Sequence, residues 1–325
     1  MPPRPSRANP SRRTSSSHLR NARDPPPPPA INPPPLDTLG IQFTCEAHLE
    51  RFRILSGRRL RPTRFYDPNI ATKLGIDGDL QQIFYSVGWH QFLNMHALSY
   101  KRITLEFLST LEVVRSNTKN PRSITFQLMN ETRHLNRTQL NTIFGWPTEG
   151  SHGPHSGRSE RYDDNTFWNL ITGQAVYYPQ RAKASGVVSP GLRTAHRFLS
   201  LTIFARGDSA GVVTSRELYI VWCLVDGASF LNHAMWLMDH LDEVTRSRGD
   251  IAIGGMITII ASSFGLDLTG QQVIPCSTRL DLKAFQTMGW IGTEVTAEGY
   301  VWKVGQRPYA YLPNPERTVI YNPEN

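Results

Sequence analysis

The sequence predicts a mainly α-helical, multi-helix globular domain with a small β-hairpin, preceded by a disordered N-terminal arm rich in proline and arginine. A chain of 325 residues with 39% hydrophobic content can bury a full core. Residues 189–249 have the pattern of three consecutive helices, whereas residues 1–40 hold 12 of the 24 prolines. We therefore expect an arm over 1–40, a helical domain over 41–312 and an extended tail over 313–325.

The arm carries most of the net charge. Residues 1–24 contain six arginines and one acid, Asp24, and so hold +5 of the chain's net +8. A segment that cannot bury apolar surface stays extended. Three interpretations stay open: nucleic-acid contact or nuclear import through phosphate-neutralising arginines, a solubilising linker, or an organelle transit peptide. The candidate nucleic-acid-binding residues here are Arg4, Arg7, Arg12, Arg13, Arg20 and Arg23.

A second arginine cluster follows the first expected helix. Helical periodicity over 44–57 ends at Gly57, and six arginines fall within 51–64. The cluster is a candidate phosphate-contacting patch on the folded domain, or else a solvated or salt-bridged helix edge, because acids lie close in sequence. The candidate nucleic-acid-binding residues here are Arg58, Arg59, Arg61 and Arg64.

Local signals predict two short helices and then a longer one. Asp67 followed by Pro68 predicts an N-cap and a first-turn proline, and this helix should end near Gly75. Another helix is expected over 79–88. Apolar spacing predicts helix again between residues 89 and 114.

The pattern then changes to strand. Apolar and polar residues alternate over 122–135, with Asn130 and Glu131 where a tight turn would be, which predicts the β-hairpin. Asn136 and Gln139 have capping-box spacing and predict the start of a helix that ends at Gly145.

A polar segment over 147–165, rich in glycine, serine and proline, marks either a subdomain break or a mobile excursion. His152 and His155 have the spacing of metal ligands, but no partners that would complete a coordination shell are evident. We therefore favour an exposed loop, which a short helix over 165–173 follows.

The central three-helix stretch has the clearest signals. Ser189 and Pro190 predict the first helix start, and Thr214 with Glu217 predicts a capping box for the second. Residues 218–225 leave no polar face, so this helix must be covered on all sides and should end at Gly227.

Towards the C-terminus, residues 254–266 predict a buried helix and Tyr300, Trp302 and Val304 a short strand. The tyrosines among prolines further on predict an extended segment packed on the surface. They are Tyr309, Tyr311 and Tyr321.

Catalytic patterns are weak throughout. Residues 208–211 resemble an aspartic-protease string, but predicted helices flank them where that chemistry needs an apolar strand. Asp239, Asp242 and Glu243 should occupy the solvated polar face of a helix rather than bind catalytic metals. His233 and His240 on that helix lack a third ligand. We predict no catalytic residue, no metal site and no cofactor.

Composition also limits the setting. The cysteines, Cys45, Cys223 and Cys276, are few and far apart, which excludes a disulfide framework and favours a reducing compartment. No window reaches the roughly 18 apolar residues of a membrane span. We therefore expect no membrane association, and either the nucleus or the cytoplasm as the location.

Three blocks carry a resemblance to a known family: GIDGDLQQIFYSVGWHQFLNMHALSYKRITLEFLSTLEV, SITFQLMNETRHLNRTQLNTIFGWP and HRFLSLTIFARGDSAGVVTSRELYIVWCLVDG. In this order they resemble the plant Athila-type first-open-reading-frame family of gypsy-class retrotransposons and the related putative plant transposon protein domain. The resemblance covers most of residues 58–270. It implies a protein in the gag-like position, with self-association and packaging of element RNA as its expected role.

The leading hypothesis is thus a retrotransposon-derived, non-enzymatic gag-like protein that associates with itself and with nucleic acid, RNA in preference to DNA, and has no small-molecule substrate. Scattered cysteines cannot form a zinc knuckle, so arginines would have to bind the RNA. The alternatives are a nuclear protein-interaction module without nucleic-acid binding and a metal-dependent nuclease or transposase.

Overall fold

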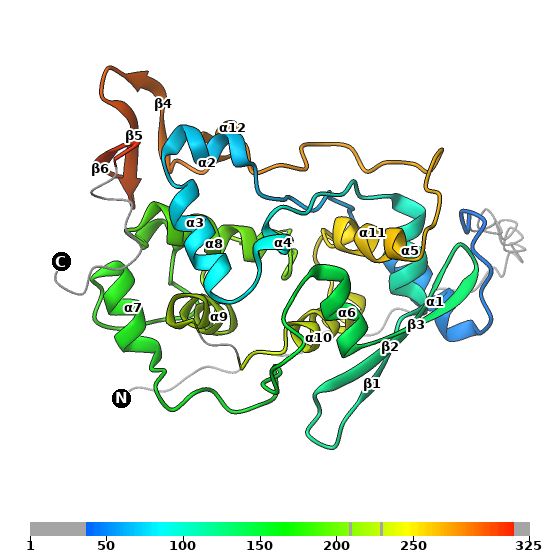
Figure 1. Cartoon of the computed structure of the whole chain (residues 1–325). Coiled ribbons are helices and arrows are strands. Elements are labelled where there is room, and N and C mark those ends of the chain that lie inside the picture. Colours follow the sequence, from blue (N-terminus) through cyan, green and yellow to red (C-terminus); the bar gives the residue numbers. More distant parts are fainter. Residues whose placement is uncertain (1–36, 208–209, 228–229, 315–325) are drawn as a thin grey trace, which may run out of the picture. The chain divides into compact units, whose positions relative to one another are not determined.

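The computed structural model of the chain describes residues 37–207, 210–227 and 230–314 (Figure 1). The six arginines of the predicted arm, the Asp208–Ser209 part of the protease-like string and Tyr321 lie outside these residues. The part from Asp37 onward forms one compact unit.

Twelve α-helices and six β-strands are present among the described residues, so the fold is mixed and the expectation of a mainly helical domain is corrected. The first helices are α1 (Glu46–Ser56), α2 (Pro68–Leu74), α3 (Asp77–Ser86), α4 (His90–Leu93), α5 (Lys101–Thr110) and α6 (Arg137–Phe144). The others are α7 (Asp164–Thr172), a 3-10 turn η1 (Ala184–Gly186), α8 (Pro190–Leu201), α9 (Ser215–Asp226), α10 (His233–Arg246), α11 (Gly254–Ser263) and α12 (Leu282–Thr287). Within the described ranges, no helix is long and apolar enough to cross a membrane.

The predicted hairpin is part of a three-stranded antiparallel sheet formed by β1 (Glu112–Arg115), β2 (Pro121–Leu128) and β3 (Glu131–Asn136). The turn lies at Met129 and Asn130, one residue before the predicted position, and both residues have positive φ. The buried carboxylate of Glu106 on α5 accepts the backbone N–H groups of both residues and so holds the turn.

The helix predicted between residues 89 and 114 was wrong in extent. The segment contains α4, α5 and then β1, because Leu111 turns to extended backbone after α5. Val113 pairs with Ile124 of the next strand, β2, and this strand pairing overrides the apolar spacing that favoured a helix.

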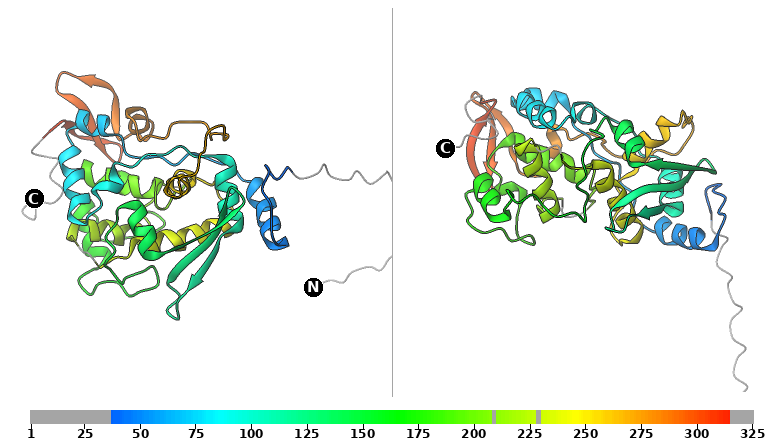
Figure 2. Two further views of the ribbon diagram at one scale, coloured as in Figure 1. Left: turned by 45° about the vertical axis from the view of Figure 1, so that its right-hand side comes forward. Right: turned by 60° about the horizontal axis from the view of Figure 1, so that its bottom comes forward.

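The second sheet was missed as a sheet. Strands β4 (Ile291–Thr296), β5 (Gly299–Val304) and β6 (Arg307–Leu312) pair in sequence order. The strand predicted around Trp302 is β5, and the extended segment predicted at Tyr309 and Tyr311 is strand β6, which pairs with β5. Figure 2 shows the two sheets on different sides of the helices.

The capping signals are confirmed. The Ser189 side chain accepts the N–H of Leu192 with Pro190 in the first turn, and Thr214 and Glu217 form a reciprocal capping box at the start of α9. Gly227 ends α9 in the left-handed conformation that favours glycine. Residues 217–224 of α9 are buried, as expected of a central helix.

An aromatic cluster lies within the hydrophobic core. Its members are Trp89, Phe92, Phe144, Trp146, Phe198 and His233. Trp89 Nε1 donates to His233 Nε2 over 3.1 Å, which requires that this nitrogen carry no proton. Burial lowers the pKa of His233 to about 3, so the imidazole stays neutral and acts as a core acceptor.

A buried arginine connects the second sheet to α8. The guanidinium of Arg193 donates to the carbonyls of Val187 and Lys303, the latter over 2.7 Å, and its Cζ lies 4.1 Å from the Trp302 ring centroid. These contacts supply the Arg193 cation with two carbonyl acceptors and an aromatic face, and no carboxylate takes part.

Candidate functional site

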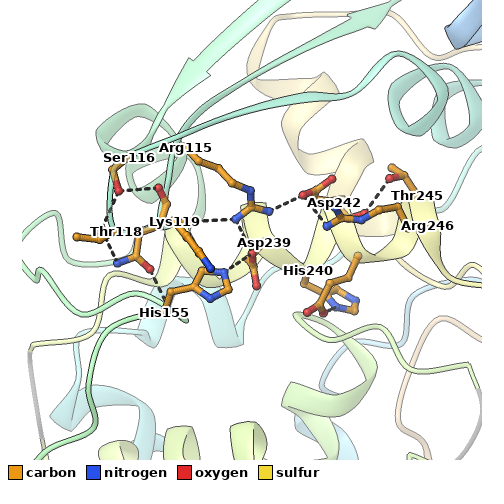
Figure 3. Close-up of polar contacts among 12 residues, drawn as sticks. Arg115, Ser116, Thr118, Lys119, His155, Asp239, His240, Asp242, Thr245 and Arg246 are labelled. Carbon is orange, nitrogen blue, oxygen red and sulfur yellow. Dashed lines mark hydrogen bonds and ion pairs between the residues drawn. The ribbon is translucent and has the colours of Figure 1, made fainter.

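The acidic face of α10 is paired with cations rather than solvated, which corrects the sequence expectation (Figure 3). The buried carboxylate of Asp239 accepts from Arg115 Nη1 of β1 over 2.8 Å and lies 3.1 Å from His155 Nε2. Arg115 also contacts Asp242, which Arg246 contacts over 2.7 Å. His155 lies in the predicted exposed loop and contacts this network from there.

Glu243 continues the network toward α9. Arg216 Nη1 donates to both of its carboxylate oxygens, over 2.9 and 2.8 Å, and His240 Nδ1 lies 3.5 Å away. Burial alone would raise the pKa of Glu243, but the contacts with His240 and Arg216 outweigh it and lower the pKa to about 2. The carboxylate is thus held charged by its partners.

This arrangement leaves the α10 carboxylates to arginine rather than to a divalent cation. Within residues 37–207, 210–227 and 230–314, no group of three or more His, Cys, Asp and Glu side chains could hold a metal ion. His233 and His240 do not act together either, because His233 faces Trp89 and His240 faces Glu243.

A buried network that the sequence did not indicate joins α8 to α9. Ser200 Oγ donates to Glu217 Oε1 over 2.8 Å, while His196 Nε2 lies 3.3 Å from Ser200 Oγ and 3.5 Å from Glu217 Oε2. In a nucleophile–base–acid triad the histidine contacts serine and acid through different nitrogens. Here one nitrogen faces both and all three side chains are buried, so the network supports packing of the two helices.

The predicted arginine cluster after α1 divides into two kinds of residue. Arg58 donates to the carbonyls of Val244 and Gly249, each over 2.7 Å, and so satisfies the end of α10. Arg61 forms an ion pair with Asp250. Arg59 is exposed and Arg64 half-buried, and neither has a carboxylate partner among the described residues.

Arg59, Arg61 and Arg64 line one pocket of about 550 Å³, which we call the arginine pocket. Its other lining residues are Leu60, Pro62, Arg197, Leu201, Arg206, Gly207, Ala210, Gly211, Ala252, Pro275 and Cys276. The structure thus brings three of the four predicted arginines together with two from α8 and the loop after it. Arg58 does not line the pocket.

Arg197 and Arg206 were missed from the sequence as site residues. Arg206 Nη1 donates to the carbonyl of Val212 and to Glu217, over 2.7 and 2.9 Å. Arg197 lies within α8, whose other face is buried, and no local spacing relates it to residues 59–64. The one local signal in the sequence was that Arg197 is a charged residue within a helical segment, and most of the other residues of that helix are buried in the structure.

These features define, within the described residues, a mixed helical and stranded fold with two charge clusters, one of paired charges on α10 and one dominated by arginines. The ATHILA ORF-1 family model matches residues 43–228, more than half of the chain. The chain belongs to the ATHILA ORF-1 family and is a retrotransposon-derived plant protein, which confirms the family identified from the sequence. No curated protein and no solved structure matches it.

Proposed function

We propose that this chain is the gag-like protein of its element, a non-enzymatic protein that associates with itself and binds nucleic acid, RNA in preference to DNA. The observation that supports this most is the exposed guanidinium of Arg59, which has no acidic partner among the described residues and lies at a pocket lined by four further arginines. Guanidinium groups bind phosphates without reading bases, so binding should tolerate sequence.

The arm should supply further phosphate contacts. Its six arginines and single acid within residues 1–24 are set in a proline-rich segment. Arginine neutralises phosphate groups without needing a particular fold around it. Deletion of residues 1–40 should therefore weaken binding more than any single arginine substitution in the folded part.

Self-association is the second half of this proposal, and it is tested apart from nucleic-acid binding. Light scattering after size-exclusion chromatography, with and without RNA, should show larger assemblies when RNA is present; RNA-independent assembly without RNA binding would favour the protein-interaction module.

The binding test is a salt titration of fluorescence anisotropy with labelled single-stranded RNA and DNA of mixed sequence. For single strands the logarithm of the affinity falls with log salt by roughly 0.7 for each phosphate neutralised. We expect the slope to become shallower on deletion of residues 1–40 and, less so, in Arg59→Ala. Arg53→Ala is the matched control, because Arg53 is equally a surface arginine but pairs with Glu46 and Glu50. Equal slopes for all four proteins would overturn the proposal.

A further inference from the structure

We propose that the arginine pocket binds a phosphorylated ligand of nucleotide size, with Arg197 as a half-buried cation that receives a phosphate group. This inference goes beyond the proposed function and does not rest on it, because a small ligand could occupy the pocket whether or not the chain binds RNA strands.

The charge of the pocket lining supports an anion. Asp250 offsets Arg61 and Glu217 offsets Arg206. Arg59, Arg64 and Arg197 have no carboxylate partner within the described part of the chain, and no acid is among the described lining residues. Five arginines with two acidic partners leave an excess of positive charge, and a bound anion would reduce the repulsion between them.

Arg197 is the residue that such an anion would relieve most. Its Nε and Nη2 lie 2.9 and 2.7 Å from Met288 Sδ, a weak acceptor, and its buried Nη1 has no hydrogen-bond partner. Its Cζ lies 5.7 Å from the Trp290 ring centroid. Burial, together with the charges of Arg64 and Arg206, lowers the pKa of Arg197 to about 10. A buried polar group without a partner is uncommon in proteins and is often completed by a ligand.

The geometry and size favour phosphate over a simpler anion. The planar guanidinium fork matches phosphate oxygens bidentately. A volume of about 550 Å³ exceeds what a single ion needs and lies within the range of small-molecule sites. Pro62, Leu201, Ala252 and Pro275 add an apolar side that suits a sugar or a base. The shared chemistry is a nucleoside phosphate, either a free nucleotide or the 5′-phosphate end of a strand.

The pocket contains its own reporter. Cys276 lines the pocket and is exposed, whereas Cys45 is exposed but does not line it. We would measure the rate at which iodoacetamide alkylates each thiol in the full chain by peptide mass spectrometry. Pyrophosphate or a nucleoside triphosphate should slow the reaction of Cys276, both by shielding it and by neutralising the nearby cations, and should leave Cys45 unchanged.

The decisive variant is Arg197→Met. Loss of one or two charge-assisted hydrogen bonds should weaken protection of Cys276 by roughly 10- to 100-fold in ligand concentration. Arg53→Met, which removes a surface arginine outside the pocket, should protect like the wild type. If Arg197→Met does not fold by circular dichroism, Arg64→Gln carries the same expectation.

Three results would overturn the proposal: no protection of Cys276 by either ligand, equal slowing by sodium chloride at matched ionic strength, or full protection in Arg197→Met.

A second experiment separates a free nucleotide from the 5′-phosphate end of a strand. It compares a nucleoside triphosphate with 5′-phosphorylated and 5′-hydroxyl forms of one oligoribonucleotide. Protection by the phosphorylated strand alone supports a strand end, and protection by the nucleotide supports a free ligand. If RNA fails to bind while pyrophosphate still protects Cys276, only the proposed function of the chain is contradicted. If RNA binds and neither ligand protects Cys276, only the proposed ligand site in the arginine pocket is contradicted.

Discussion

Arginine side chains have opposite roles at the acidic face of α10 and at the arginine pocket. On α10, Arg115 and Arg216 meet Asp239 and Glu243 at hydrogen-bond distance, so the cations complete the fold. Around the pocket, Arg59, Arg64 and Arg197 face no such partner among the described residues. The two regions differ in whether each arginine has a carboxylate partner. An arginine with such a partner is structural, whereas one without it can receive a ligand.

The largest effect should come from breaking the paired cluster. Asp239→Ala removes a carboxylate that is 4% exposed and leaves Arg115, Arg216 and His155 without their shared acceptor. We expect a loss of about 3 kcal/mol in the free energy of unfolding, measured by urea denaturation.

The matched control for that substitution is Glu46→Ala, because Glu46 pairs with Arg53 at a site where both side chains are largely exposed. The cost there should be about 0.5 kcal/mol. A similar cost for the two variants would show that the α10 network is no stronger than a surface pair.

The next effect concerns Glu217 of α9, which accepts from Arg206 at the arginine pocket and from Ser200 of α8. Burial raises its pKa, but His196 and Arg206 outweigh burial and lower the pKa from 4.5 to about 2. A carboxylate whose pKa is lower in the folded state stabilises the protein fully above pH 4.5, and this contribution is lost as the pH falls toward 2.

The contribution amounts to roughly 3 kcal/mol. Urea denaturation of the wild type and of Glu217→Gln at several pH values between 6 and about 3 isolates it, because the other acids titrate in both proteins. The stability of the variant should fall less steeply below pH 4.5. Parallel curves would contradict the assignment.

Arg193 and Arg197 lie one turn apart on α8, so a structural arginine and a pocket arginine can be compared within one helix. Arg193→Met should destabilise by roughly 2 kcal/mol, since the carbonyls of Val187 and Lys303 lose their donor. Arg197→Met should stabilise by about 1 kcal/mol, because a half-buried cation whose acceptor is a thioether and whose Nη1 has no partner is replaced by an apolar side chain. Thermal and urea unfolding measure both. A destabilised Arg197→Met would mean that the pocket arginine is structural after all.

The smallest effect on stability is expected at the rim. Arg59→Ala changes an exposed side chain that has no carboxylate partner among the described residues, so the free energy of unfolding should stay within about 0.5 kcal/mol. A larger loss, measured in the same urea experiment, would place Arg59 with the paired cluster rather than with the ligand-facing arginines.

Part of this molecule could be predicted because its signals are local. Ser189 with Pro190, the Thr214–Glu217 box and the left-handed glycine at 227 each act within one turn, and the structure confirms them. The turn of the first hairpin was displaced by one residue, because Glu106, 23 and 24 residues earlier, holds it from outside the hairpin.

The amino-acid sequence was enough to identify the family, the helix boundaries with clear caps and the uneven distribution of arginine. The packed fold was needed to show that residues 112–115 form a strand, that the α10 acids are paired, and that Arg59 and Arg64 share a pocket with Arg197 and Arg206. Capping energies arise between residues a few positions apart, whereas ion pairs, strand partners and pockets depend on which segments meet once the core has packed.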